Sequence, residues 1–196
     1  MMRIILASTS AIRAQLLRNA GVEFNAAAPG VDEERIKAAS FGTEPGALAD
    51  VLAREKATAV SQIVPDALVI GADQVLALDN KVYGKPETLA VARRQLENLS
   101  GKTHTLETAA AGCRNGRLAW SIHKKARLTM RPLSPEFLDR YLACMGHDAL
   151  TSVGAYKLEG HGAQLFAAVE GDYFAVLGLP LLEVLQFLRA EGALPS

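Results

Sequence analysis

The residues of this sequence that could do chemistry gather behind an apolar run. Residues 67–72 are apolar throughout, which predicts a buried strand, and Asp73 follows directly. A carboxylate at such a place is costly unless it binds a metal, pairs with a cation or acts as an acid or base. A turn-capping aspartate is the common alternative. Gln74 and Lys85 favour a functional site, because three polar groups then converge on one strand and hairpin.

A possible anion site lies near the N-terminus. Ser8 and Ser10 stand at a predicted turn from strand to helix, where free N–H groups and the helix dipole favour negative charge. Arg13, one turn into the helix, could add a two-pronged hydrogen bond to a phosphate. The simpler alternative is that Ser10 caps the helix and Arg13 is a solvated surface residue. The motif alone favours this alternative.

Other charged residues have two interpretations each. Lys85 lies between glycine and proline, a rigid setting that would hold a point charge against a phosphate, or it is an exposed loop lysine. Lys56 stands in a charged stretch of a predicted helix and would usually be solvated. The acidic run Asp32-Glu33-Glu34 could supply a carboxylate to Mg²⁺, or it is simply solvated. Glu159 and Lys157 are either paired or face a ligand.

The composition narrows the class of protein. A chain of 196 residues with 49% apolar residues and equal numbers of basic and acidic side chains, 21 each, predicts one folded domain over residues 1–196. Zero net charge implies no attraction to nucleic acid or membrane. The apolar run at the N-terminus is too short for a signal peptide, so a cytoplasmic protein is expected. The spacing of Cys113 and Cys144 predicts buried reduced thiols, and four scattered histidines make a zinc site improbable. His104 is interpreted as structural, because it has no serine or cysteine partner for a triad.

The elements that must position these residues alternate along the chain. A loop-like segment is expected over residues 25–46, a hairpin turn at Asp79 and Asn80, and strand-like pieces between the glycines of the last third. Strands are predicted near residues 3–8, 66–73, 105–113 and 118–129, and helices near 10–20, 47–63, 88–99, 137–145 and 181–191. This alternation predicts an α/β domain with a mixed sheet covered by helices.

Taken together, the motifs resemble those of the Maf family of nucleotide pyrophosphatases. They occur in the same order as in that family, and the resemblance covers essentially the whole chain. The matching stretches are LASTSAIRAQLL at residues 6–17, REKA at 54–57, GADQV at 71–75, GKP at 84–86, SGKTH at 100–104, GAY at 154–156 and GLPL at 178–181. The resemblance implies an elongated, twisted mixed sheet flanked by helices, similar to the inosine triphosphatase fold, with a central cleft. It also implies a possible homodimer.

The resemblance implies an activity and a set of roles. Proteins of this family are house-cleaning enzymes that hydrolyse modified or non-canonical nucleoside triphosphates to the monophosphate and pyrophosphate, with a divalent metal such as Mg²⁺, Mn²⁺ or Co²⁺. Asp73 would activate water, and Glu33 would bind the metal together with Asp73. The triphosphate would be held by five residues, Ser8, Ser10, Arg13, Lys56 and Lys85.

Three positions are implied to set the base preference, namely Ile12, Gln74 and Glu159. Gln74 and Glu159 are similar to the branch that prefers 7-methyl-GTP, whereas the dTTP/UTP branch has threonine and glutamine there. An acidic Glu159 suits a cationic methylated guanine or the N–H donors of guanine. The chain departs from that branch at Ile12, where an aromatic residue is usual, and at Ala11, where proline is usual.

Three alternatives remain open at this point. The first is a dTTP/UTP or broad-specificity nucleotide pyrophosphatase. The second is a nucleotide-binding regulator of cell division or septum formation, which would need a pocket but no working base. The third is a Mg²⁺-dependent phosphatase that releases orthophosphate instead of pyrophosphate.

Overall fold

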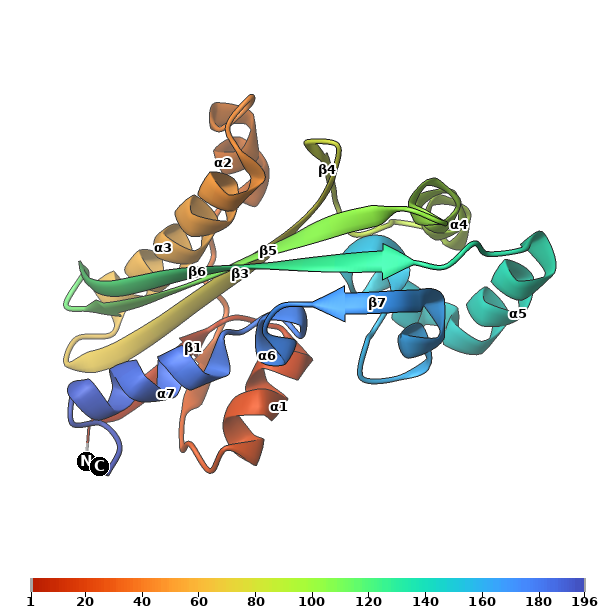
Figure 1. The fold of residues 1–196 in the computed structure, drawn as a ribbon. Helices are drawn as coiled ribbons and strands as arrows, with labels where there is room; N and C mark the ends of the chain where they lie inside the picture. Colours follow the sequence, from red (N-terminus) through yellow and green to blue (C-terminus); the bar gives the residue numbers. More distant parts are fainter. Residues whose placement is uncertain (1, 196) are drawn as a thin grey trace. The chain divides into compact units, whose positions relative to one another are not determined.

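The computed structural model describes residues 2–195 and contains a mixed sheet with helices packed against it (Figure 1). The strands are β1 (Arg3–Ala7), β2 (Asn25–Ala27), β3 (Ala67–Leu78), β4 (Lys81–Tyr83), β5 (Thr103–Arg114), β6 (Arg117–Met130) and β7 (Phe166–Glu170). The α-helices are α1 (Ala11–Asn19), α2 (Glu33–Ala39), α3 (Pro45–Ile63), α4 (Leu89–Leu99), α5 (Pro135–Met145), α6 (Tyr173–Val176) and α7 (Leu181–Ala190). The 3₁₀ turns are η1 (Gly146–Leu150), η2 (Val153–Ala155) and η3 (His161–Leu165).

The seven strands follow the order β2-β1-β3-β5-β6-β7, with β4 paired to β3. Strands β2 and β3 run parallel to β1, whereas the β3–β4 and β6–β7 pairs are antiparallel. The predicted α/β class, with a mixed sheet flanked by helices, is therefore confirmed. None of the helices in residues 2–195 combines the length and apolar character needed to cross a membrane.

The chain divides into two compact units. The first consists of Met1–Gln74, Thr108–Lys124 and Asp172–Ser196, and the second of Val75–Glu107 and Lys125–Gly171. Strands β3, β5 and β6 each contribute residues to both units. The predicted domain over 1–196 includes Met1 and Ser196, which lie outside the described residues. The single domain, the elongation and the central cleft stay predictions.

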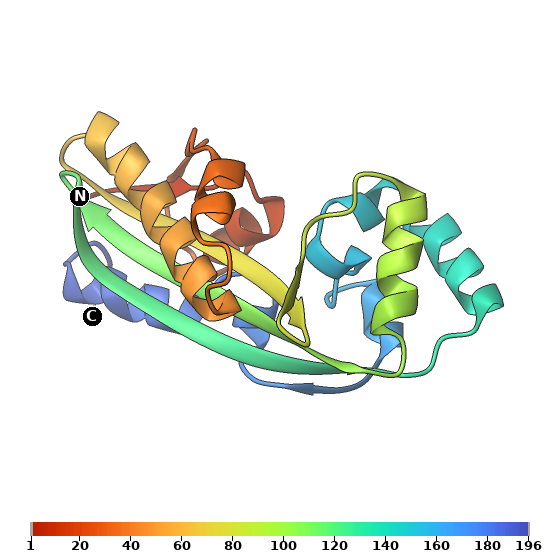
Figure 2. The ribbon, with the colours of Figure 1, turned by 90° about the horizontal axis from the view of Figure 1, so that it is seen from above.

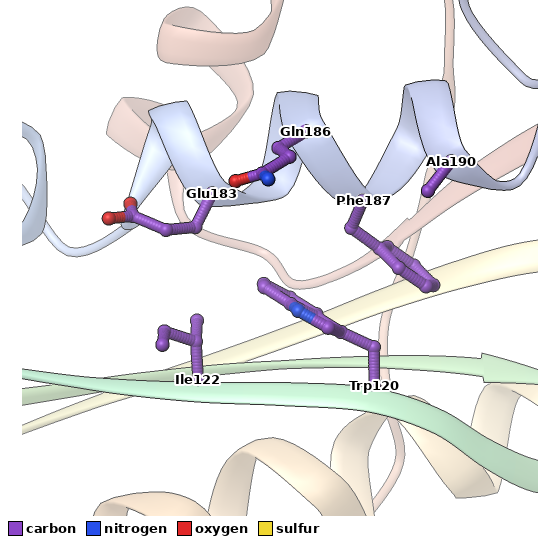
Figure 3. Close-up of a pocket in the computed structure, with 6 residues that line it drawn as sticks. All are labelled: Trp120, Ile122, Glu183, Gln186, Phe187 and Ala190. Carbon is purple, nitrogen blue, oxygen red and sulfur yellow. The ribbon is translucent and has the colours of Figure 1, made fainter.

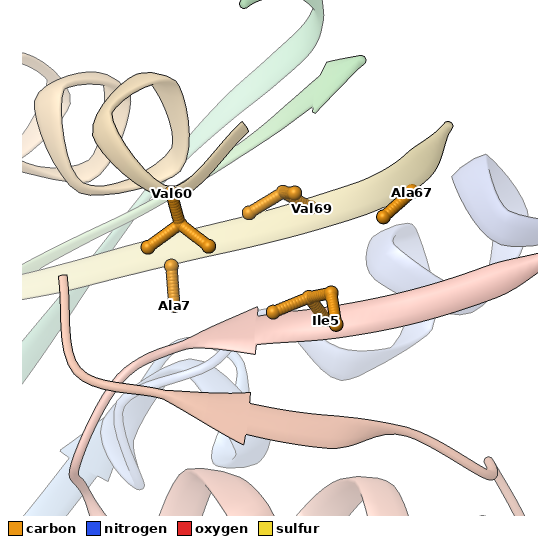
Figure 4. Close-up of a cluster of buried hydrophobic side chains, with 5 residues drawn as sticks. All are labelled: Ile5, Ala7, Val60, Ala67 and Val69. Carbon is orange, nitrogen blue, oxygen red and sulfur yellow. The ribbon is translucent and has the colours of Figure 1, made fainter. Parts of the chain in front are cut away.

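The first unit has helices on both faces of its part of the sheet. Helix α3 lies on one face, and α1 and α7 lie on the other (Figure 1). Val60 of α3 packs into a buried cluster formed with side chains of β1 and β3 (Figure 4). The other members of this cluster are Ile5, Ala7, Ala67 and Val69. Burial of such apolar surface, worth roughly 25 cal/mol per Å², holds the helix on the sheet.

Gly71 fixes how closely α3 approaches β3. A Cβ atom at this position would lie 2.4 Å from the carbonyl oxygen of Ala53 and 2.6 Å from the backbone nitrogen of Ala57. Both contacts are backbone atoms of α3, which cannot move aside as a flexible side chain could. Only glycine therefore permits this packing, and Lys56 is carried on the same part of the helix.

Gly71→Ala should lower the free energy of unfolding by about 2–3 kcal/mol, because α3 would have to move away from the sheet. Chemical denaturation measures this loss. Gly84→Ala is the control, since no atom lies within 4 Å of a Cβ at Gly84. Equal stability of the two variants would contradict the close packing of α3 on Gly71.

The second unit is built around α4, α5 and the 3₁₀ turns, with α4 beside α5 (Figure 2). His104 of β5 is 1% exposed and shares a hydrogen bond of 2.7 Å with the hydroxyl of Tyr156. Burial lowers the pKa of His104 to about 4. The imidazole is therefore neutral at pH 7, which agrees with the structural role expected from the sequence.

The buried imidazole makes stability depend on pH. An unfolded histidine has a pKa near 6.5, so between roughly pH 6.5 and 4 the unfolded chain binds more protons than the folded one. The neutral imidazole therefore contributes to the free energy of unfolding, and this contribution is fully present above pH 6.5. It is lost as the pH falls toward 4, and the total loss is up to about 3 kcal/mol. Urea unfolding of wild type and His104→Gln at several pH values between 4 and 8 measures this loss. The free energy of unfolding should change less with pH in the variant than in wild type. Identical slopes would rule out His104 as the titrating group.

Several expected elements differ from the structure. Residues 25–46 are not one loop, because Asn25–Ala27 pairs with β1 and Glu33–Ala39 is helical. The acidic run begins that helix, since Asp32 accepts a hydrogen bond from the backbone nitrogen of Arg35 at 3.0 Å. In the last third, as far as the structure describes it, most of the strand-like pieces are 3₁₀ turns, and only Phe166–Glu170 is a strand.

Two other predictions have mixed outcomes. Asp73 does not end a strand, because β3 continues without a break to Leu78. The hairpin turn after it is confirmed: Asp79 and Asn80 both have positive φ, at 50° and 60°, as a tight two-residue turn requires. Both cysteines are free as predicted, but only Cys113 is buried and Cys144 is exposed.

Candidate active site

The centre of the candidate site is the ammonium group of Lys56, which binds two carboxylates. Its Nζ lies 2.6 Å from Oδ1 of Asp73 and 2.7 Å from Oε1 of Glu33. Lys56 and Asp73 are 6% and 7% exposed. The interpretation of Lys56 as a solvated helix charge is therefore wrong, and the pairing joins α2, α3 and β3 at one point.

The local folding explains why these groups meet. Successive side chains of a strand point to opposite faces, so Asp73 shares the face of Gly71, on which α3 packs. Lys56 lies between Ala53 and Ala57, the two residues of α3 that touch Gly71. Close packing at the glycine therefore brings the lysine to the carboxylate two residues further along the strand.

Arg13 of α1 is bound to the protein backbone. Its Nε donates to the carbonyl oxygen of Gly178 at 2.7 Å, and its Nη1 donates to the carbonyl oxygen of Ala72 at 2.9 Å. Burial lowers the pKa of Arg13, while the negative charges of Asp73 and Glu33 act to raise it. The interpretation of Arg13 as a solvated surface residue is therefore wrong, because this guanidinium lies among the charged groups of the site.

The two serines form the turn before α1. Ser8 is buried, and its Oγ accepts hydrogen bonds from the backbone nitrogen of Ser10 at 3.1 Å and from Nη1 of Arg13 at 3.4 Å. Ser10 occupies the N-cap position, but its side chain makes no capping hydrogen bond. The hydroxyl of Ser10 is thus not required by the helix start, and its predicted phosphate contact stays a prediction.

Gln74 points to the opposite face of β3 from Asp73. Its amide nitrogen Nε2 lies 3.0 Å from the hydroxyl of Thr108, 2.9 Å from the carbonyl oxygen of Ala175 and 3.0 Å from that of Val176. These bonds occupy both amide N–H groups and fix the orientation of the side chain. Only the amide oxygen Oε1 remains for a ligand. Ile12 is partly buried on α1, and its predicted role in base selection stays a prediction.

Lys85 and Glu159 belong to the second unit, whereas the other predicted site residues belong to the first. Both are exposed. Lys157 pairs with Asp148 at 3.0 Å, and no ion pair of Glu159 occurs within residues 2–195. The alternative that Lys157 pairs with Glu159 is therefore wrong. The predicted roles of Lys85 and Glu159 stay predictions.

The carboxylates fit the divalent metal that was expected. No group of three or more His, Cys, Asp or Glu side chains in the described part of the chain is arranged to hold a metal. Glu33 and Asp73 are nevertheless close, since each contacts the same ammonium group. Two carboxylates are the usual protein share of a Mg²⁺ site, which takes its other ligands from water and substrate phosphates.

Thr108 and the turn of residues 175–178 were missed by the sequence analysis. Thr108 is fully buried in β5, and its hydroxyl donates to the carbonyl oxygen of Ala175 at 2.9 Å. A signal for it was present, because Glu107 and Thr108 are polar residues directly before the apolar run of residues 109–113 in the predicted strand. The turn accepts these hydrogen bonds through its backbone carbonyl oxygens, which a side-chain motif cannot predict.

A separate apolar pocket lies between α7 and β6 (Figure 3). Trp120 and Phe187 stack there with ring centroids 4.9 Å apart, and the cavity measures about 290 Å³. The remaining lining residues are Ile122, Glu183, Gln186 and Ala190. None of the predicted site residues lines this pocket, so it is distinct from the cluster around Lys56.

A family model described as "Maf-like protein" matches residues 3–191. The chain belongs to the Maf family. Curated relatives of this Maf chain include a "7-methyl-GTP pyrophosphatase" of Rhizobium johnstonii (strain DSM 114642 / LMG 32736 / 3841), 50% identical over 98% of each chain. Another protein of that name, from Brucella abortus biovar 1, is 45% identical over 96% of each chain. A "Nucleoside triphosphate pyrophosphatase" of Caulobacter vibrioides is 48% identical over 97% of this chain and 96% of its own.

Among solved structures, a HAM1 protein from Coxiella burnetii aligns with 66% of this Maf chain and 73% of its own, with 17% identity and a TM-score of 0.41. This similarity is too distant to support a conclusion, so the predicted likeness to the inosine triphosphatase fold stays a prediction.

Proposed function

We propose that this chain is a nucleoside triphosphate pyrophosphatase that cleaves its substrate into the nucleoside monophosphate and pyrophosphate. The observation that carries the proposal is the buried Asp73 carboxylate, held on Lys56 together with Glu33 and next to Arg13. A carboxylate surrounded by cations suits hydrolysis of a polyanion. The names of the Rhizobium and Caulobacter relatives support the same activity.

The reaction divides between a base and cationic groups. Asp73 takes a proton from water, and the water oxygen bonds to the α-phosphorus. The bond from this phosphorus to the bridging oxygen breaks, and its electron pair leaves with pyrophosphate. Lys56, Lys85, Ser8 and Ser10 bind the phosphate oxygens and stabilise the departing charge.

Glu33 and Asp73 would hold a divalent cation, Mg²⁺, Mn²⁺ or Co²⁺. When bound, the cation would supply positive charge that polarises the phosphoryl oxygens. The carboxylates for this role are already close in the structure, because Lys56 holds both of them.

The substrate that we propose is 7-methyl-GTP. Glu159 is exposed and has no ion pair within residues 2–195, so its charge is available to a cationic methylated guanine. Gln74 offers its amide oxygen as an acceptor, and Ile12 gives an apolar side chain near the start of α1. The names of the Rhizobium and Brucella relatives support this choice. We further propose a cytoplasmic location and a homodimer.

The second candidate is a pyrophosphatase for dTTP, UTP or a broad range of nucleotides. The more general name of the Caulobacter relative favours it. A panel of 7-methyl-GTP, GTP, dTTP, UTP and CTP, assayed with each metal, separates the two candidates by kcat/KM. Pyrophosphate should be the product, and orthophosphate alone would contradict the pyrophosphatase proposal.

Glu159→Gln should lower the ratio of kcat/KM for 7-methyl-GTP to that for UTP by about tenfold, roughly 1.4 kcal/mol. The reason is that the neutral amide no longer attracts the positive charge of the methylated base. Glu170→Gln is the control, since Glu170 is another exposed glutamate of the second unit. An unchanged ratio in Glu159→Gln would refute the specificity argument.

A further inference from the structure

The guanidinium of Arg13 has few donors left for a ligand. Nε is occupied by the carbonyl oxygen of Gly178, and Nη1 by the carbonyl oxygen of Ala72, with the hydroxyl of Ser8 nearby at 3.4 Å. A two-pronged grip on phosphate needs donors on two nitrogens along one edge of the guanidinium. Because Nε and Nη1 are both used, only Nη2 keeps its N–H groups within the described contacts. Arg13 therefore lacks a complete edge for a phosphate.

Arg13 joins the residue before the proposed base to the turn of residues 175–178. Ala72 directly precedes Asp73 in β3, and Gly178 ends this turn, which begins within α6. On the other side of Asp73, the amide of Gln74 binds the same turn through the carbonyls of residues 175 and 176. Both neighbours of Asp73 are thus tied to one segment of the chain.

The turn is shaped to receive the arginine. Gly178 has φ of +102°, a conformation that side chains rarely adopt, and a Cβ there would lie 3.4 Å from Nε of Arg13. Glycine adopts this conformation without strain, and in it the carbonyl oxygen of Gly178 accepts from Nε of Arg13 at 2.7 Å. This geometry favours a permanent contact between Arg13 and Gly178 over an Arg13 side chain that is free to bind a ligand.

We infer that Arg13 is a positioning residue, which fixes residues 72–73 of β3 against the turn of residues 175–178 and does not itself grip the triphosphate. We call this link between residues 72–73 and the turn of residues 175–178 the brace. The expected effect of Arg13 on turnover rests on the proposed function, whereas the existence of the brace does not. Loss of the brace would misplace the carboxylate of Asp73 relative to the bound substrate. Small errors of this kind lower the rate of the chemical step without weakening binding.

Hydrogen–deuterium exchange on the full chain tests the brace without any turnover. The amides of Gly178 and Leu179 donate to the carbonyl oxygens of Ala175 and Phe174, so they should be protected in wild type. In Arg13→Met they should exchange at least about tenfold faster. Arg18→Met, a change of an exposed arginine on the same helix, should leave them unchanged. Equal exchange in Arg13→Met and wild type would overturn the inference.

Kinetics then separate positioning from phosphate binding. In Arg13→Met, kcat should fall at least about 100-fold, while the Kd for pyrophosphate stays within about threefold of wild type. A Kd weakened tenfold or more would overturn the inference in favour of a direct phosphate contact. If Arg13→Met does not fold, Arg13→Lys takes its place in both experiments. Lysine keeps the charge but cannot bind both carbonyls as the guanidinium does, so the same outcomes apply.

The two proposals fail differently. If wild type shows no turnover with any triphosphate, the proposed function fails, and the exchange experiment still decides whether the brace exists. If wild type is active and the exchange rates of Arg13→Met do not change, only the positioning role is lost.

Discussion

Asp73→Asn should lower kcat at least about 1000-fold while leaving nucleotide affinity within about threefold of wild type. Asparagine is nearly the same size, and its Oδ1 can still accept from Nζ of Lys56, which lies 2.6 Å from the carboxylate in wild type. It cannot take a proton from water. Steady-state kinetics with 7-methyl-GTP measure kcat, and calorimetric titration with a non-hydrolysable analogue of 7-methyl-GTP measures the nucleotide affinity.

Asp139→Asn is the matched control, because Asp139 is an exposed aspartate that pairs with Arg93 outside the candidate site. It should keep normal turnover. Turnover of Asp73→Asn within tenfold of wild type would show that another group activates the water. The regulator alternative makes a different prediction, since wild type itself would then bind nucleotide without turnover.

Lys56→Met should lower the free energy of unfolding by about 3 kcal/mol and kcat by at least about 100-fold. The side chain of Lys56 is 7% exposed, and its ammonium group holds both Asp73 and Glu33, so its loss leaves two neighbouring carboxylates without their shared cation. Their repulsion would also loosen α2, which carries Glu33 and has no buried residue of its own. Urea unfolding and steady-state kinetics measure the two effects.

The matched control is Lys37→Met. Lys37 forms an ion pair of 2.7 Å with Glu34, whose side chain is 85% exposed. Exposed pairs of this kind contribute about 0–1 kcal/mol, so stability should change little. If Lys56→Met were as stable and active as this control, neither the stabilising nor the phosphate-binding role of Lys56 could be maintained.

Much of the fold follows from local signals. The apolar run at residues 67–72 predicted a buried strand, and the turn at Asp79 and Asn80 was placed correctly. The helix predicted near residues 137–145 is α5, and it begins with Ser134 as its N-cap, whose hydroxyl accepts from the backbone nitrogen of Phe137. Such signals act over a few residues, so the sequence contains them in full.

The misplaced elements depend on distant partners. The three-residue strand Asn25–Ala27 exists because β1 lies beside it, and α2 is held through the pairing of Glu33 with Lys56. Neither segment has an apolar periodicity of its own, since α2 contains no buried residue. Propensity alone therefore predicted a loop.

The sequence by itself determined the family, the α/β class and the identity of the residues that could do chemistry, because motifs and apolar periodicity are local properties. Only the tertiary structure decided what those residues touch. It placed Lys56 between Asp73 and Glu33, and it bound Arg13 to the carbonyls of Ala72 and Gly178. These contacts join positions up to 165 residues apart, and they exist only once packing at Gly71 and around α6 has brought the backbone together.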